Sequence, residues 1–529
     1  MDSSRYKPLK NGRSLRSRSV DGFVVPRRGS SATHSQQPAL PTSPSTHRKL
    51  PSLLNQNIPN RAYPKYIEPR RPLRPVKRRH IVRTWTLRFA SVLIVAFLAT
   101  GGFLSWRGYS SVHRVFRGST TVAALASDHV NPDLLNGEGD GRVNILLLGI
   151  GGAGHDGPDL TDTMLVLSVD PVNHTAALLS IPRDLWVKMP TNFFGNYQKI
   201  NAAYESAKYS YIGKLDASNS NEKALRAGFA ADDALIKQIL GININYHMLV
   251  DFQAFRQAID TVGGVPVDVK SQLYDPTMAW ENHNNPVLAA AGLQDMDGKE
   301  ALLYARSRET SSDFARTERQ RQILLALKDK VLSAGTLSNP AKIDSLLNAF
   351  GNNLYSDLST KGAQRLYTIM KQIDNGDIKS IGLADPPNNF VTTDHIGNIS
   401  VVRPRSGFNN YVEIQKYVRS QLKDGYILKE NAAITVVNGS ATPSTTQAVA
   451  ADLKLYGYNV TNVITTEHAF SSQNTSVVDL SQGKNPYSKR YLEERYHTKA
   501  VTKLPSGIAV QPDSAKFVII QGQDEVSNN

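Results

Sequence analysis

The 529-residue sequence contains no cysteine, and this absence limits its chemistry. Disulfide bonds, thiol catalysis and cysteine-based metal sites are excluded, because each requires a sulfhydryl side chain. The chain also lacks H-E-x-x-H, G-x-S-x-G and Walker motifs. A zincin metal site, a serine-hydrolase nucleophile elbow and a P-loop are therefore not predicted.

Acidic residues are scarce in the first 88 residues, which hold 20 Lys and Arg against 3 Asp and Glu. The other 441 residues hold 41 basic and 43 acidic side chains, so the net charge of +15 comes from the tail. A nucleic-acid-binding domain would carry its basic excess on a folded surface, so no nucleic-acid partner is predicted. Residues 1–84, rich in proline, serine and arginine, are expected to be a disordered cytoplasmic tail.

One long apolar run follows this tail. Residues Phe89 to Trp106 form 18 residues without a charged side chain, which is near the lower limit for a membrane-spanning helix. A soluble core helix or a cleaved signal peptide is the alternative, but few core helices are apolar all round and the tail is too long for a signal peptide. We expect a transmembrane signal anchor at 85–107. The basic tail would contact membrane lipid on the cytoplasmic side, and later residues would lie outside the cell.

Strand-like and helix-like segments alternate after the apolar run. Apolar runs at 143–149, 164–170 and 176–182 predict strands, and periodic stretches at 199–208, 231–241 and 252–264 predict helices. The expected fold is a mixed α/β/α sandwich, an extracellular catalytic domain at 140–335. A juxtamembrane stem is expected at 108–139 and a helical and loop extension at 336–428. The alternation restarts near 430, which predicts a small C-terminal α/β domain at 429–525.

A glycine-rich loop with three aspartates follows the first predicted strand. Its GIGGAG segment (149–154) fits G-x-G-x-x-G, but a proline-containing segment and a strand follow, whereas dinucleotide binding requires a helix there. Backbone N–H groups of such a loop can approach an anion. The loop carboxylates of Asp156, Asp159 and Asp162 are candidate Mg²⁺ ligands, with local turn formation as the competing explanation.

Five arginines lie within sixteen residues near the middle of the chain. They are Arg306, Arg308, Arg316, Arg319 and Arg321. Arg306 and Arg308 would share one face if YARSR were extended. Arg316, Arg319 and Gln320 would share one face of the following helix. Guanidinium forks bind phosphate bidentately, and a solvated charged helix is the alternative.

Other candidate residues are more isolated. Arg183 follows Pro182 in SIPRD, so a rigid turn holds it, although a surface salt bridge would explain it equally. Asp313 is positioned to cap the arginine-rich helix. His247 and His283 lack metal-ligand spacing, so structural or surface roles are predicted for both.

Seven segments, in order across residues 143–332, resemble the LytR-CpsA-Psr family of cell-wall glycopolymer ligases. They are VNILLLG, LTDTMLVLSVDP, LLSIPRDLWV, KINAAYE, VDFQAFRQAIDTVGGVPVDV, AGLQDMDGKEALLYARSR and SDFARTERQRQILLAL. The terminal VVNGS, YGYNV and VIIQGQD segments are similar to the LytR C-terminal domain of some members. The resemblance implies Mg²⁺-dependent transfer of a polymer from a polyprenyl-pyrophosphate carrier to peptidoglycan, outside the membrane.

The resemblance also implies roles for individual residues. Asp162 matches the family's carboxylate metal ligand. The implied catalytic residues are Arg183, Arg306, Arg308, Asp313 and Arg316, and the implied substrate-binding residues are Lys199 and Gln320. Arg319 is expected to bind substrate or to support the other arginines. Asp313 is either the base for the acceptor hydroxyl or the group that orients Arg316. The prenyl chain requires an apolar pocket, expected between the sheet and the helix at 251–261.

The sequence departs from the family pattern at the metal site. Many members have an aspartate where Gly151 stands, and often an arginine before DTM that is absent here. His155, Asp156 and Asp159 are the candidates to replace the missing ligand. Two alternatives follow. The chain is either a non-catalytic wall-associated protein that binds the lipid carrier or has a regulatory role, or a polyprenyl-pyrophosphate pyrophosphatase.

Overall fold

The computed structural model of the protein describes residues 110, 112–113, 115–127, 129–190, 195–213, 221–307, 313–333, 353–384, 389–439, 443–465, 472–506, 508 and 515–524. The predicted cytoplasmic tail (1–84) and transmembrane anchor (85–107) lie outside the described residues. Within these ranges, no helix is both long enough and apolar enough to cross a membrane.

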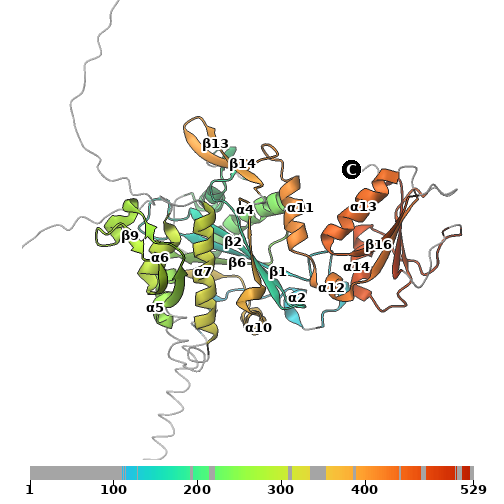
Figure 1. Cartoon of the computed structure of the whole chain (residues 1–529), viewed down its shortest axis with the longest axis horizontal. Helices are drawn as coiled ribbons and strands as arrows, with labels where there is room; N and C mark the ends of the chain where they lie inside the picture. The colour runs from blue at the N-terminus through green and yellow to red at the C-terminus, as the bar shows by residue number, and fades with distance from the viewer. Residues whose placement is uncertain are drawn as a thin grey trace, which may run out of the picture. The chain divides into compact units, whose positions relative to one another are not determined.

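A six-stranded sheet forms the centre of the main domain (Figure 1). Its strands are β1 (Val143–Ile150), β2 (Thr161–Asp170), β3 (Thr175–Ser180), β6 (Tyr246–Asp251), β11 (Leu354–Ser356) and β12 (Ile378–Gly382), in the order β11-β6-β1-β2-β3-β12. β1 pairs antiparallel with β2 and parallel with β6. β3 pairs antiparallel with β2 and parallel with β12. The sheet is therefore mixed, and the three strands predicted from apolar runs lie side by side at its centre.

Helices pack on both faces of this sheet, which explains why the strands are almost continuously apolar. On one face lie α3 (Ala203–Ile212), α4 (Glu222–Leu240) and α11 (Val412–Gln421). On the other face lie α10 (Thr360–Lys371) and part of α7 (Asp313–Leu332). The alternation along β2 separates the two cores: Met164 and Val166 belong to the first, Leu167 and Val169 to the second. The fold is a mixed α/β architecture, as predicted.

A second group of short elements packs against α7 and completes the main domain. They are α5 (Phe252–Val262), β7 (Val265–Val269), β8 (Leu273–Tyr274), the 3₁₀ turn η3 (Pro276–Glu281), β9 (Val287–Ala289), β10 (Gly292–Met296) and α6 (Gly298–Arg306). They share a hydrophobic core with Ile323 of α7. Asp251 caps α5 by accepting a hydrogen bond from the Ala254 backbone N–H at 2.7 Å.

The YARSR segment differs from the extended conformation considered above, because α6 runs through Arg306. Asp297 and Glu300 form a reciprocal capping box at its start, and GKEALLYAR contains no β-branched residue. These local preferences outweigh the extended alternative. Arg308 lies outside the described residues.

The C-terminal domain has a four-stranded sheet of order β16-β15-β18-β17. Its elements are α12 (Gly425–Glu430), β15 (Ala433–Asn438), α13 (Pro443–Tyr456), β16 (Asn459–Ile464), β17 (Ser476–Asp479), α14 (Pro486–Arg495) and β18 (Phe517–Gln521). β15 runs parallel to both β16 and β18, and β17 is antiparallel to β18. A small α/β unit therefore lies where the second alternation of sequence patterns predicts one.

Residues of the expected stem and extension contribute to the cores of the main sheet and of the C-terminal unit. Ala124 and Leu125, in the expected stem, pack into the core of the main sheet, whereas Val130 and Leu135 pack into the C-terminal core. The expected extension supplies both edge strands, β11 and β12. The remaining short elements are α2 (Ala123–Ala126), η1 (Pro132–Leu134), β4 (Trp186–Lys188), β5 (Tyr197–Lys199), η2 (Ile200–Ala202), η4 (Asn375–Asp377), β13 (Val391–Ile396) and β14 (Ile399–Pro404).

His247 has the structural role that its isolated position predicts. Its Nδ1 lies 2.6 Å from Asp357 and its Nε2 lies 2.9 Å from Asp233. The ring stacks on Phe229 with centroids 4.5 Å apart. Burial disfavours the imidazolium, but the hydrogen bonds with both carboxylates outweigh burial and raise the pKa of His247 to about 9.

This pairing predicts a pH-dependent contribution to stability. The folded-state pKa lies above the ordinary value of 6.5, so the stabilisation is complete below pH 6.5 and is lost as pH rises through 9. We therefore compare the free energy of unfolding of the wild type with that of His247→Gln. The difference between them should change by on the order of 3 kcal/mol, to the disadvantage of the wild type, as pH rises through this window. Urea denaturation at a series of pH values measures the difference, and parallel profiles for the two proteins would contradict the assignment.

Candidate functional site

One edge of the main sheet gathers the predicted site residues. β1, β3 and β6 end at this edge and β2 begins there, because Gly149 pairs with Thr163, Ile150 pairs with Asp251, and Leu165 pairs with Ser180. The SIPRD turn follows β3 at the same edge. The side chains carried by these strand ends are therefore brought together from segments far apart in sequence.

An apolar cavity of about 150 Å³ lies between β1, β2, β6 and the helices α5, α6 and α7. Its lining residues are Leu147, Leu148, Gly149, Thr163, Leu165, Met248, Val250, Asp251, Phe252, Phe255, Leu302, Ala305, Arg306, Gln320 and Leu324. A Cβ atom at Gly149 would lie 2.9 Å from Thr163 Cβ, so glycine at this position keeps β1 and β2 clear of side-chain bulk. The cavity lies where a pocket between the sheet and the 251–261 helix is predicted.

Arg306 is a charged residue in the wall of this cavity. Its two terminal nitrogens donate to both carboxylate oxygens of Glu281, at 2.9 and 3.1 Å. Its guanidinium carbon lies 4.9 Å from the centroid of the Phe252 ring. The Arg306 side chain is only 7% exposed, so α6 presents a largely desolvated and oriented cation to a mostly apolar wall.

The first half of α7 carries the next predicted residues. Arg316 and Arg319 are buried, and Gln320 donates to Thr163 Oγ1 at 3.3 Å and to the Ala305 carbonyl at 3.4 Å. Gln320 thus joins α7 to β2 and to the end of α6. Helix α7 begins at Asp313, but nothing is described of the Asp313 side chain, so its two predicted roles stay predictions.

Arg319 supports the Arg306 segment instead of facing the cavity. Its Nε donates to the Tyr304 carbonyl at 2.9 Å and one terminal nitrogen donates to the Ser307 carbonyl at 2.5 Å. Both acceptors flank Arg306 in sequence. Two donor nitrogens of Arg319 thus fix backbone at the end of α6, and its predicted binding of substrate stays a prediction.

A second polar group forms around the start of β2 and the SIPRD turn. Arg183 pairs with Asp162 at 2.5 Å, and Asn201 donates to the same carboxylate at 3.2 Å. Lys199 pairs with Asp184 at 2.8 Å. The predicted residues Asp162, Arg183 and Lys199 are therefore brought into one network. Asp162 immediately precedes Thr163, which lines the cavity.

The three loop carboxylates are not brought together. Asp159 is buried against Lys208 at 2.7 Å, with exposed fractions of 2% and 1%, while Asp162 pairs with Arg183 and Asp156 is exposed. Among the residues that the structure describes, no group of three or more acidic, histidine or cysteine side chains could hold a metal. Asp156, Asp159 and Asp162 therefore lie in three different surroundings, and metal binding by any of them stays a prediction. The internal lysine accounts for the burial of Asp159.

His155 takes the space beside Gly151. A Cβ atom at Gly151 would lie 2.8 Å from His155 Cγ, so an aspartate there would require the imidazole to move. The imidazole packs edge-on against Phe252, with centroids 5.0 Å apart. His155 therefore packs as an aromatic ring next to the cavity wall.

Glu205 is a carboxyl group near Asp159 and Asp162 that no sequence pattern indicates. Burial and the nearby Asp159 carboxylate raise the pKa of Glu205 to about 7, with a smaller contribution from Asp162 and an opposing one from Lys208. Glu205 and Lys208 are three residues apart on α3, so they share a helix face. That spacing was visible in KINAAYESAK, but nothing in the sequence placed it under the glycine-rich loop.

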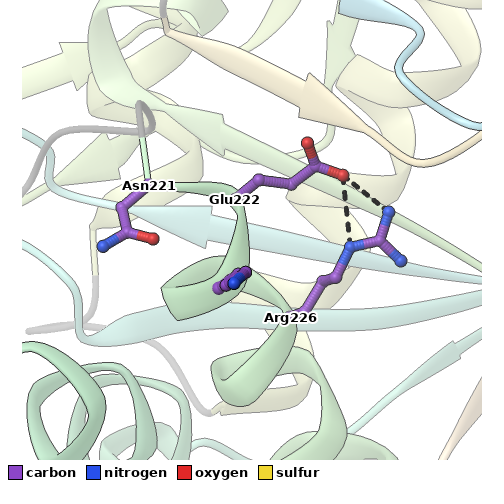
Figure 2. A pocket seen from close by; sticks show the side chains of 4 residues that line it. Asn221, Glu222 and Arg226 are labelled. Atoms are coloured by element: carbon purple, nitrogen blue, oxygen red, sulfur yellow. Dashed lines mark hydrogen bonds and ion pairs between the residues drawn. The ribbon is translucent and has the colours of Figure 1, made fainter.

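A second hollow lies at the start of α4, and its chemistry is that of an ordinary surface. It is lined by Asn221, Glu222, Lys223 and Arg226. Figure 2 shows the Arg226 guanidinium turned onto Glu222, a pair in which Arg226 is 62% exposed and Glu222 is 45% exposed. No predicted site residue lines this hollow, and an exposed pair of this kind contributes little.

Comparisons with known proteins show the family of the chain. The model of the LytR_cpsA_psr family matches residues 112–406, which is more than half of the chain. The chain is similar to the polyisoprenyl-teichoic acid–peptidoglycan teichoic acid transferase TagV of Bacillus subtilis (strain 168), with 33% identity over 236 residues, 43% of this chain and 54% of TagV. It is also similar to the transferase TagU of Oceanobacillus iheyensis, with 30% identity over 292 residues, 54% of this chain and 81% of TagU.

A solved structure is also similar to part of the chain. The crystal structure of B. subtilis TagV aligns with 53% of this chain and 97% of the TagV chain, with 27% identity and a TM-score of 0.40. In the sequence comparison, the chain spans about half the length of TagV.

The two hydrogen bonds of Arg319 predict a large stability difference between neighbouring arginines. Arg319→Met would leave the Tyr304 and Ser307 carbonyls without these donors, so we expect the free energy of unfolding to fall by about 3 kcal/mol. The matched control is Arg321→Met, whose partner Glu318 lies on the partly exposed side of the same helix. We expect a loss below about 1 kcal/mol there. Equal losses in urea denaturation would contradict the supporting role.

Proposed function

Because the chain belongs to the LytR_cpsA_psr family, we propose that it is a transferase that moves a glycopolymer from a polyprenyl-pyrophosphate carrier to peptidoglycan. The supporting observation is that an apolar cavity and a row of cations lie at one edge of the sheet. The cavity suits a prenyl chain, and Arg306, Arg183 and Lys199 suit a pyrophosphate head group. The printed names of TagV and TagU, both teichoic acid transferases, support the same reaction class.

In the proposed reaction, an acceptor hydroxyl oxygen of peptidoglycan bonds to the phosphorus that carries the glycopolymer. The anhydride P–O bond breaks, polyprenyl phosphate leaves, and the hydroxyl proton passes to a base. Asp313 stays the candidate base, and orienting Arg316 stays its alternative role. The guanidinium groups of Arg183 and Arg306 stabilise negative charge on the phosphoryl oxygens as this bond breaks.

We propose that Mg²⁺ binds through Asp162 together with the substrate. Mg²⁺ is commonly held by one or two carboxylates, substrate phosphates and several waters, so one partly exposed carboxylate beside the phosphate site fits that mode. A bound ion would supply charge neutralisation to the phosphates. Arg183 and Asn201 already contact Asp162, so these two residues would orient the carboxylate for the ion.

The proposed cellular arrangement follows from the sequence. A transmembrane helix at 85–107 would anchor the chain, with the basic tail in the cytoplasm and the main domain outside, near lipid-linked substrate. Residues 429–525, the C-terminal α/β unit, are proposed to be a LytR C-terminal domain on the strength of their sequence resemblance.

One observation favours a second candidate function, a non-catalytic protein that holds or senses the lipid carrier. Gly151 stands where the family pattern has an aspartate, and the described residues hold no cluster of three metal-ligating groups. A pyrophosphatase, in which water replaces the sugar hydroxyl, is the third possibility. The three functions share a binding site and differ in product.

The transferase proposal is tested with the full-length protein in detergent, a lipid-pyrophosphate-linked glycan, peptidoglycan oligomers and Mg²⁺. We expect glycan joined to peptidoglycan. Phosphate release without joining would support the pyrophosphatase, and tight binding without product would support the carrier-binding protein. In the same assay Arg306→Ala and Arg183→Ala should lose at least about 100-fold in rate while retaining their fold.

Two matched variants sharpen this prediction. Arg306→Lys should also lose most transfer, because an ammonium group keeps the charge but lacks the planar fork. Arg226→Ala, in the exposed pair of Figure 2, should transfer at the wild-type rate. Wild-type activity in both Arg306→Ala and Arg183→Ala would overturn the site assignment.

A further inference from the structure

The 3₁₀ turn η3 is attached at both ends to the segment that carries Arg306. At its start, Asp275 accepts a hydrogen bond from Ser307 Oγ at 2.7 Å and also caps the turn through Thr277. At its end, the two carboxylate oxygens of Glu281 accept hydrogen bonds from the two terminal nitrogens of Arg306. Between them Met278 is buried in the adjacent core. The turn is therefore fixed to two consecutive residues, Arg306 and Ser307.

The Glu281–Arg306 pair is bidentate and largely removed from water. Arg306 is 7% exposed and Glu281 is 16% exposed. The Phe252 ring lies against the guanidinium. Two N–H···O contacts and a ring fix the direction of the guanidinium plane, which a single contact would leave free to rotate.

We propose that Glu281 is a positioning residue that aims the Arg306 guanidinium at the pyrophosphate of the donor lipid. This inference rests on the proposed function, in which Arg306 binds that head group. Glu281 itself reaches the substrate only through Arg306. No motif singles out Glu281, because it precedes Arg306 by 25 residues and follows an unremarkable PTMAW sequence.

Two physical reasons support a positioning role. An arginine side chain loses much rotamer freedom when it is held in one geometry, and a preformed pair removes that cost before the ligand arrives. A guanidinium carries five N–H donors, more than one carboxylate can engage, so pairing with Glu281 and binding of an anion are compatible.

The anchoring of η3 argues against the opposite role, in which Glu281 merely occupies the ligand's place and must leave. A displaceable carboxylate would be expected on a mobile, exposed segment. Instead Asp275 and Ser307 hold the start of the turn, and Asn282, just after it, donates to the Val287 carbonyl at 2.9 Å. The backbone that carries Glu281 therefore cannot move away unless these contacts break, and only rotation of the side chain would take the carboxylate off Arg306.

The test measures binding of geranylgeranyl pyrophosphate and of the uncharged geranylgeraniol to the full-length protein in detergent micelles. We expect Glu281→Gln to weaken pyrophosphate binding on the order of tenfold, as removal of an orienting partner commonly does. Binding of the alcohol should be unchanged, because it uses only the apolar cavity. The matched control Glu222→Gln, which removes the carboxylate of another arginine pair, should bind both ligands as the wild type does.

A double-mutant cycle shows whether Glu281 acts through Arg306. Arg306→Ala should weaken pyrophosphate binding by itself, and adding Glu281→Gln should cause no further loss. Glu281→Asp keeps the negative charge on a shorter side chain, so its affinity for pyrophosphate should lie between those of the wild type and Glu281→Gln. This variant replaces Glu281→Gln in the test if the amide variant does not fold. Tighter or wild-type pyrophosphate binding by Glu281→Gln, with Arg306→Ala impaired, would overturn the inference and leave the proposed function intact.

The remaining outcomes also decide the question. A loss from Glu281→Gln that persists in the Arg306→Ala background would show that Glu281 acts by another route, which overturns the inference. Wild-type binding by Arg306→Ala would overturn the proposed role of Arg306 and the inference with it.

Discussion

Five basic side chains at or near one edge of the main sheet are each held by an oxygen acceptor from another element. Arg183 is held by Asp162, Lys199 by Asp184, Lys208 by Asp159, Arg306 by Glu281, and Arg319 by backbone carbonyls. A cation buried without such a partner would carry a large desolvation cost. These pairs therefore let the protein hold oriented guanidinium and ammonium groups beside an apolar cavity before any anion is bound.

Because each buried cation needs an acceptor, the basic residues fall into two groups according to what they contact. Arg319 and Lys208 are engaged below the surface of the site, where they fix the end of α6 and the glycine-rich loop. Arg183 and Arg306 pair with carboxylates of partly exposed or cavity-lining elements, where an anionic ligand can share the guanidinium. The supporting cations thus hold the backbone in place for the ones proposed to contact substrate.

Sequence patterns predicted three adjacent strands of the main sheet, left out the inner strand β6, and missed the two edge strands for physical reasons. Strands β1 to β3 are long, buried on both faces and separated by turn residues, so their apolar runs are unambiguous. Strand β11 has three residues and β12 has five, and both take part in the sheet only through pairing with β6 and β3. Such tertiary pairing leaves no periodic signal in the chain, which is why residues 336–428 could not be placed.

Sequence patterns likewise indicated some residues of the site and missed the contacts of others. Asp162, Arg183, Lys199, Arg306 and Gln320 lie at or beside the cavity edge, as the order of segments implied. The contacts of Asp159 and Arg319 could not be read from the sequence. The partner of Asp159 is Lys208, which lies 49 residues away, and the partners of Arg319 are backbone carbonyls, which no side-chain pattern reveals. Glu281 went unnoticed because a bidentate pair 25 residues apart follows no helix or strand period.

The central claim is that the cavity between α5, α6, α7 and the sheet holds the prenyl chain with its pyrophosphate at Arg306. Photolabelling the full-length protein with a benzophenone-bearing prenyl pyrophosphate, followed by peptide mass spectrometry, tests it most directly. We expect labelling of peptides that contain Phe252, Phe255 or Leu302, and we expect unlabelled geranylgeranyl pyrophosphate to suppress it. Competable labelling confined to the hollow around Asn221 and Arg226, with the cavity peptides unlabelled, would contradict it.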